Sequence, residues 1–254
     1  MSSAFGESGG RLDYSGYLHL RELLKLQEGR SDAPDELLFI VVHQVYELWF
    51  KVLLGSLEAA RAAIGSDLLR RAVHELARVR VIERLLVDQV DVLETMAPHD
   101  FLAFRSQLAP ASGFQSVQFR EIEFISGLKD ESYLARLDAD PEERERLARR
   151  LAEPSLAEAF AALLSRRRVP SVAAIYAGSE PERERLADLR ELGEALLDHD
   201  ESFALWRARH LLMVERQIGS KPGTGGSSGA EYLRTTQAKR FFPDLWQARS
   251  GFTL

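Results

Sequence analysis

The chain has 254 residues, of which 45% are hydrophobic and 28% are charged, and its formal net charge is −6 at pH 7. This length predicts a single domain over residues 1–254, with a core large enough to enclose a small ligand. Because the sequence has no cysteine, disulfides, thiolate metal sites and cysteine catalysis are excluded, and the negative charge argues against a nucleic-acid-binding protein.

The N-terminus lacks the charged start and the apolar stretch of a secretory signal. The longest uninterrupted apolar run, residues 37–42, is far too short to span a bilayer. We therefore expect a cytoplasmic protein with no membrane-spanning segment.

Hydrophobic residues recur at three- and four-residue spacing along most of the chain, with Arg and Glu between them, which is typical of amphipathic helices. The predicted helices cover residues 14–27, 35–64, 67–96, 116–128, 142–151, 155–166, 181–198, 203–218 and 230–239. No alternating run bounded by turn residues predicts a strand. The expected fold class is all-α, a helical bundle.

The segment from about residue 129 to residue 200 differs from the rest of the chain. It is richer in charge and alanine, and it contains Pro141, Pro154, Pro170 and Pro181. We predict that it forms a small, more variable helical insert packed on a core made by the two ends of the chain.

His43 lies in the most apolar predicted helix, within FIVVHQVYELWFK, and shares a face with Phe39 and Phe50. A core histidine satisfied by a backbone carbonyl is one interpretation. Glu47, one turn later, also permits a metal-ligand pair, although a carboxylate-rich metal site normally needs more than one such pair.

His210 is the second histidine on an apolar stripe, in SFALWRARHLLMVERQIG. Trp206 precedes it by one turn and Val214 follows it by one turn on the same face. Histidines on two apolar helices suit a haem pocket, in which one nitrogen binds iron and a second side chain faces the opposite side. The other histidines, His19, His74, His99 and His199, lie among charged or turn residues and are expected to face solvent.

The segment GSKPGTGGSSG, residues 219–229, lacks the order of a phosphate-binding loop and follows a helix rather than a strand. It is interpreted either as a flexible connection between helices or as a mobile lid, whose N–H groups and Thr224 hydroxyl close over a polar ligand.

Arg105 stands on a short, mostly apolar helical run, four residues after Phe101. A guanidinium there requires a carboxylate, which either the protein or a ligand could supply.

Four blocks together resemble the tryptophan 2,3-dioxygenase family: YSGYLHLRELLKLQ, DELLFIVVHQVYELWFK, DFLAFRSQLAPASGFQSVQFREIEF and WRARHLLMVERQIGSKPGTGGSSGAEYLRTT. The likeness covers most of residues 13–242 and is weakest between about residues 129 and 200. It implies an all-helical homotetramer containing haem b. Such an enzyme inserts both atoms of O₂ across the indole C2–C3 bond of L-tryptophan to give N-formylkynurenine.

The resemblance also implies roles for individual residues. His210 matches the haem iron ligand, with Trp206 beside the cofactor, and His43 matches the histidine that faces the indole N–H. Arg105 matches the residue that binds the substrate carboxylate, and Thr224 the one that holds the amino-acid end. The matching substrate-pocket positions are Phe39, Phe101, Leu108 and Ser112, and Tyr14 and Tyr17 match tyrosines that reach a neighbouring subunit's site.

Some bacterial family members carry Tyr at the position of Phe101, so one hydroxyl contact to the substrate carboxylate is absent here. Two alternatives stay open at this point. Relatives with the same anchors act on substituted tryptophans, in some cases adding a single oxygen atom, and a helical protein could bind haem or an aromatic amino acid without turnover.

Overall fold

The computed structural model describes residues 13–136, 140–177 and 179–251. Its helices are α1 (Tyr14–Tyr17), α2 (Leu20–Leu23), α3 (Glu36–Gly65), α4 (Leu69–Leu93), α5 (Pro98–Arg105), α6 (Val117–Ser126), α7 (Ser132–Arg136), α8 (Pro141–Ala152), α9 (Leu156–Arg166), α10 (Glu180–Arg185), α11 (Ala187–Ile218), α12 (Ala230–Thr236) and α13 (Pro243–Ala248). Short 3₁₀ turns cover Gly113–Gln115, Val172–Ile175 and Arg249–Gly251. The described residues contain no strand, and the predicted all-α class is confirmed.

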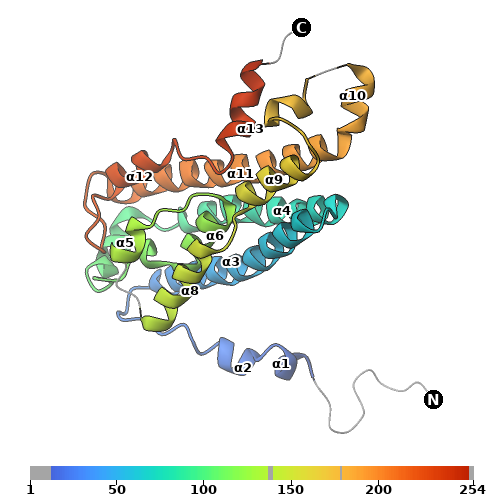
Figure 1. Ribbon diagram of the computed structural model, residues 1–254. Coiled ribbons are helices and arrows are strands. Elements are labelled where there is room, and N and C mark those ends of the chain that lie inside the picture. Colours follow the sequence, from blue (N-terminus) through green and yellow to red (C-terminus); the bar gives the residue numbers. More distant parts are fainter. Residues whose placement is uncertain (1–12, 137–139, 178, 252–254) are drawn as a thin grey trace, which may run out of the picture.

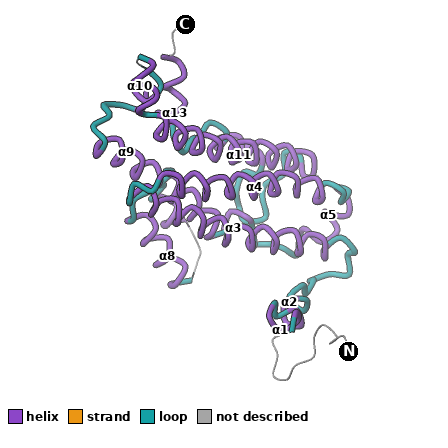
Figure 2. Tube along the Cα trace, turned by 90° about the vertical axis from the view of Figure 1, so that its right-hand side faces the viewer, coloured by secondary structure: helices purple, strands orange, loops and turns teal. Residues whose placement is uncertain are grey.

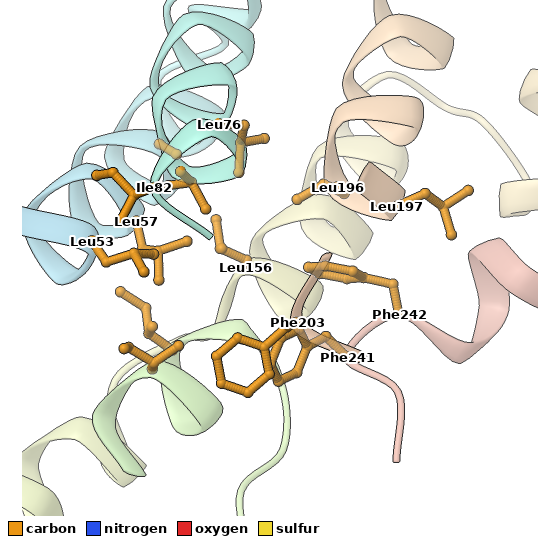
Figure 3. Packing of buried hydrophobic residues seen from close by; sticks show 14 of the residues in the cluster. Leu53, Leu57, Leu76, Ile82, Leu156, Leu196, Leu197, Phe203, Phe241 and Phe242 are labelled. Carbon is orange, nitrogen blue, oxygen red and sulfur yellow. The ribbon is translucent and has the colours of Figure 1, made fainter. Parts of the chain in front are cut away.

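The long helices α3, α4 and α11 lie side by side and form the body of the molecule (Figures 1 and 2). Helices α6 and α9 pack on α3, α8 packs on α6, and α12 packs on α11. Figure 3 shows how their apolar faces meet, with Leu53 and Leu57 of α3 near Ile82 of α4 and Phe203 near Phe241. Burial of each large side chain of this kind contributes about 1.5–3 kcal/mol to folding.

The segment predicted as an insert contributes to the same core. Leu156, Phe160 and Leu163 of α9 are buried in the main hydrophobic cluster. The predicted boundary near residue 200 falls inside α11. The division into one domain with an insert stays a prediction.

Helix α11 runs without interruption through the break predicted between residues 198 and 203. Two of the polar residues at that break, His199 and Asp200, are buried with hydrogen-bond partners and lie within the helix. Asp200 accepts hydrogen bonds from the backbone N–H groups of Phe241 and Phe242 at 2.9 and 3.0 Å and from the indole N–H of Trp246 at 2.9 Å.

The prediction that His199 faces solvent is wrong, because its side chain is completely buried. Its Nδ1 lies 2.7 Å from a carboxylate oxygen of Glu83 on α4, and its Nε2 lies 2.9 Å from the hydroxyl of Ser126 on α6. A single imidazole therefore joins three helices. His19, His74 and His99 are exposed, as predicted.

The predicted first helix is two single turns, α1 and α2, separated at His19, whose φ of 52° lies in the left-handed region. Both turns stand apart from the bundle (Figures 1 and 2). Tyr14 is 76% exposed and Tyr17 is 66% exposed.

By length and composition, α3 could cross a membrane, and no other helix among the described residues meets that test. One such helix is weak evidence, because the core helix of a bundle passes the same test. Here α3 packs against α4, α6 and α9.

Candidate functional site

A cavity of about 320 Å³ lies between α3, α5, α6, α11, α12 and the glycine-rich segment 219–229. This size falls within the range of small-molecule sites, roughly 300–1,000 Å³. The predicted site residues that line it are Phe39, His43, Phe101, Arg105, Ser112, Trp206, His210 and Thr224. Segments far apart in the sequence thus meet at one cavity.

Three predicted site residues do not line this cavity. Leu108 packs against the hydrophobic core instead. Tyr14 and Tyr17 lie on α1, exposed and outside the bundle.

His43 points its ring into the cavity from the middle of α3. Its Nδ1 lies 2.7 Å from the carbonyl oxygen of Phe39, and because a carbonyl only accepts, this nitrogen carries the proton. Burial lowers the pKa of His43 below its usual value, although the Phe39 carbonyl and the charge of Glu47 oppose that effect. The ring is therefore neutral at pH 7, and its Nε2 is a hydrogen-bond acceptor.

His210 lines the same cavity from α11. Burial, with a smaller contribution from the charge of His43, lowers the pKa of His210 to about 4. Trp206 stacks on the His210 ring with the centroids 5.0 Å apart and the planes at 6°. An uncharged imidazole whose lone pair is free can serve as a metal ligand.

Aromatic side chains form the cavity walls between the two histidines. The rings of Phe39 and Phe101 are stacked with their centroids 5.7 Å apart, and Phe119 lies 5.3 Å from Trp206. These walls make the space that both imidazoles face largely apolar.

Arg105 and Thr224 fasten the glycine-rich segment 219–229 to the segment that follows α5. The Arg105 guanidinium donates a hydrogen bond to the carbonyl of Pro222, and the Thr224 hydroxyl donates one to the carbonyl of Ala111 at 2.6 Å. Gly225 makes the close approach possible, since a Cβ there would lie 2.5 Å from the Cβ of Ser112. Both side chains predicted to bind substrate thus hold a loop over the cavity.

The sequence analysis missed a charged group on the cavity wall. Glu123 lies 2.6 Å from Arg120 and 2.9 Å from Arg207, and all three side chains are buried. Burial acts to lower the pKa of Arg120, but the pKa is raised, because the Glu123 carboxylate together with other neighbouring groups outweighs burial. The pKa of Arg207 is lowered, because burial dominates there. The i, i+3 spacing of Arg120 and Glu123 was a visible signal, yet on an amphipathic helix it suggests a surface ion pair.

The alternative of a metal held by His43 and Glu47 finds no support among the described residues. No group of three or more His, Cys, Asp or Glu side chains there could hold a metal ion. The Glu47 carboxylate instead accepts hydrogen bonds from Ser116 at 2.6 Å and from Gln118 at 2.8 Å. A metal at this cavity would have to arrive with a cofactor.

Comparison with known proteins decides the family. The family model described as tryptophan 2,3-dioxygenase matches residues 2–174 and 163–252. This chain belongs to the tryptophan 2,3-dioxygenase family. A protein named tryptophan 2,3-dioxygenase from Nocardioides sp. is 53% identical over 97% of both chains, and one from Anaeromyxobacter sp. is 47% identical over 94% of this chain and 96% of its own.

A third family member, from Herpetosiphon aurantiacus, is 46% identical over 94% of this chain and 98% of its own. The resemblance found in the four sequence blocks is thereby confirmed, and the weakly similar central segment lies within the matched ranges.

The low pKa of His210 predicts how acid affects the ligand-free protein. The folded-state pKa of about 4 lies below the ordinary value near 6.5, so the unfolded state binds more protons between these pH values. Stability should therefore fall as the pH drops from about 7 to about 4, by up to ~3 kcal/mol from this group.

Urea unfolding of the wild type and of His210→Leu at pH 7.5 and pH 4.5 measures this contribution. The wild type should lose more stability than His210→Leu, while His74→Leu, which removes an exposed histidine, should behave as the wild type does. Equal losses in the wild type and His210→Leu would contradict the prediction.

Proposed function

We propose that this protein is a haem-dependent dioxygenase that inserts both atoms of O₂ across the indole C2–C3 bond of L-tryptophan to give N-formylkynurenine. The observation that carries the proposal is the shared cavity. Two neutral imidazoles, His43 and His210, face it from different helices, and two hydrogen-bond donors, Arg105 and Thr224, lie where the glycine-rich segment meets it. The family membership supports the reaction.

The donor set of the cavity fits haem b. His210 would bind the iron through a neutral imidazole nitrogen, with Trp206 stacked on that ring. Arg120 and Arg207 share a single carboxylate, Glu123, on the wall, and the positive charge left over suits the carboxylate side chains that haem carries. When bound, haem supplies the activation of O₂, and the protein supplies binding and orientation.

The amino-acid end of the substrate is held by Arg105 and Thr224. Both side chains line the cavity and donate to backbone carbonyls of the protein itself, so their N–H and O–H groups point to acceptors. A substrate carboxylate is a stronger acceptor than a neutral carbonyl and binds a guanidinium bidentately. Because Phe101 has no hydroxyl, these residues carry the recognition of the carboxylate.

The indole end is held by His43. Its Nε2 accepts a hydrogen bond from the indole N–H, since Nδ1–H is committed to the Phe39 carbonyl. Removal of the indole proton is a poorer role, because burial makes this imidazole a weaker base than usual. His43 thus fixes the orientation of the double bond that reacts.

The walls and the loop exclude water from the reacting groups. Phe39 and Phe101 stack beside His43, and the segment 219–229 covers the opening next to Arg105. A closed apolar site of this kind protects reactive species from side reactions with water.

The protein is proposed to be a cytoplasmic homotetramer, in which Tyr14 and Tyr17 reach a neighbouring subunit's cavity. Their high exposure on α1, away from the bundle, supports this arrangement. Exposed apolar residues also lie along α3, α4 and α11, and a second subunit would cover them. They are Leu37, Val41, Leu48, Val52, Val81, Leu85, Val92, Leu205 and Leu212.

Replacement of His210 by alanine should abolish stable haem binding, because cysteine is absent and haem is held without a covalent bond. Haem titration of the purified variant, followed by absorption spectra, measures this. A variant that retains a full complement of haem and normal turnover would show that His210 is not the iron ligand.

Replacement of Arg105 by lysine should weaken tryptophan binding by roughly 10- to 150-fold, because a charge-assisted bidentate contact contributes about 1.5–3 kcal/mol. Lysine keeps the charge but not the planar fork. Steady-state kinetics with tryptophan and with tryptamine, which lacks the carboxylate, measure the effect. If both substrates turn over equally well in the wild type, Arg105 does not recognise a carboxylate.

Isotope labelling tests the reaction itself. With L-tryptophan and ¹⁸O₂, the haem-loaded protein should form N-formylkynurenine that contains two labelled atoms. A singly labelled product with an intact ring would identify a mono-oxygenase acting on the same amino-acid anchors. Normal haem and tryptophan binding without oxygen consumption would identify a binding protein.

A further inference from the structure

His199, His210 and Gln217 lie on one narrow stripe of α11. A helix turns by about 100° and rises by about 1.5 Å per residue. Viewed along the axis, His199 and Gln217 therefore coincide, and both are displaced by about 20° to the same side of His210, at heights of about 16 Å and about 10 Å from it. Any contact that fixes the rotation of these two residues also fixes the rotation of His210.

His199 is held from two other helices. Its nitrogens lie 2.7 Å from the Glu83 carboxylate on α4 and 2.9 Å from the Ser126 hydroxyl on α6. All three side chains are 0% exposed. Rotation or sliding of α11 would break at least one of these bonds and leave a buried polar group without a partner, which costs about 1–3 kcal/mol.

Gln217 fastens the other end of the stripe. Its side-chain amide donates to the carbonyl of Met96, just after α4, at 2.9 Å, and the residue is buried. The stripe is therefore tied to the neighbouring helices three turns before His210 and two turns after it.

Apolar contacts alone would define the rotation and height of α11 less closely than these hydrogen bonds do. Phe203, Trp206 and Met213 also face inward from α11, but van der Waals contacts change little when a helix slips slightly. Hydrogen bonds between buried groups are directional, and such groups fix the register of packed helices in some proteins.

His210 depends on the placement of α11 because no hydrogen bond within the described residues holds its ring. Its stacking partner Trp206 belongs to the same helix, so the stacked pair moves with α11. The position of the ring relative to the rest of the cavity is set by the helix that carries it.

We propose that His199 and Gln217 are positioning residues for His210, which act through α11 to fix the rotation and height at which the imidazole enters the cavity. The inference rests on the proposed function, in which His210 binds haem iron. It assigns a role to two buried polar residues, of which His199 lies outside the cavity and Gln217 lies at its border.

The test uses the full chain loaded with haem and the variants Ser126→Ala, His199→Leu and Gln217→Leu. Resonance Raman spectra of the ferrous protein report the iron–histidine bond, and transfer to apomyoglobin reports the rate of haem loss. Each variant should keep its helical content, show a shifted or split iron–histidine band, and lose haem faster. The increase should be on the order of tenfold for His199→Leu, as for loss of a group that orients a metal ligand.

Arg80→Gln is the matched control. Arg80 and Asp198 form a 2.6 Å ion pair that also joins α4 to α11, one residue before His199, but both side chains are nearly half exposed. This variant should leave the iron–histidine band and the rate of haem loss unchanged.

Variants that melt at lower temperature but keep the wild-type band and rate of haem loss would overturn the inference, since a merely structural role predicts that result. If His199→Leu fails to fold, Ser126→Ala decides in the same way, because Ser126 contacts His199 and lies outside the cavity. A wild type that binds haem without an iron–histidine band would overturn the proposed ligand itself, and the inference with it.

Discussion

The site depends on keeping two imidazole rings uncharged between α3 and α11. Water would protonate histidine in mildly acidic solution, and burial prevents this by penalising the charged form. A neutral His210 has a lone pair for a metal, and a neutral His43 has an acceptor for an N–H group. The packing of Phe39, Phe101, Phe119 and Trp206 around them is therefore a condition of the chemistry as well as of stability.

The fold class and the inward placement of His43 and His210 could be predicted from the sequence because they follow from local periodicity. His43 and His210 each sit on a stripe of apolar residues, and such a stripe faces inward wherever the helix packs. The proposed roles of Arg105 and Thr224 follow from the family resemblance, and both residues line the cavity.

His199 could not be predicted in this way. Its neighbours Asp198, Asp200 and Glu201 suggest a solvent-facing turn, yet within a continuous helix these side chains point in different directions, and Asp200 is buried while Asp198 is exposed. The partners that satisfy His199, Glu83 and Ser126, are distant in sequence. Periodicity records which face is apolar, but it does not record which distant polar groups meet there. The contact of Glu123 with Arg207 could not be predicted either, because these two residues are also distant in the sequence.

The loop contacts of Arg105 and Thr224 have a consequence for measured affinity. In the proposed role of Arg105 and Thr224, the carbonyls of Pro222 and Ala111 are bonded to the donors that the substrate carboxylate would use, so they act as internal competitors of the incoming amino acid. The apparent dissociation constant is then the intrinsic one divided by the fraction of molecules in which the donors are free. Substitutions in the glycine-rich segment that alter this fraction would change the apparent affinity for substrate without altering any atom that touches the substrate. Two relatives with identical binding residues could therefore differ in affinity through their loops alone.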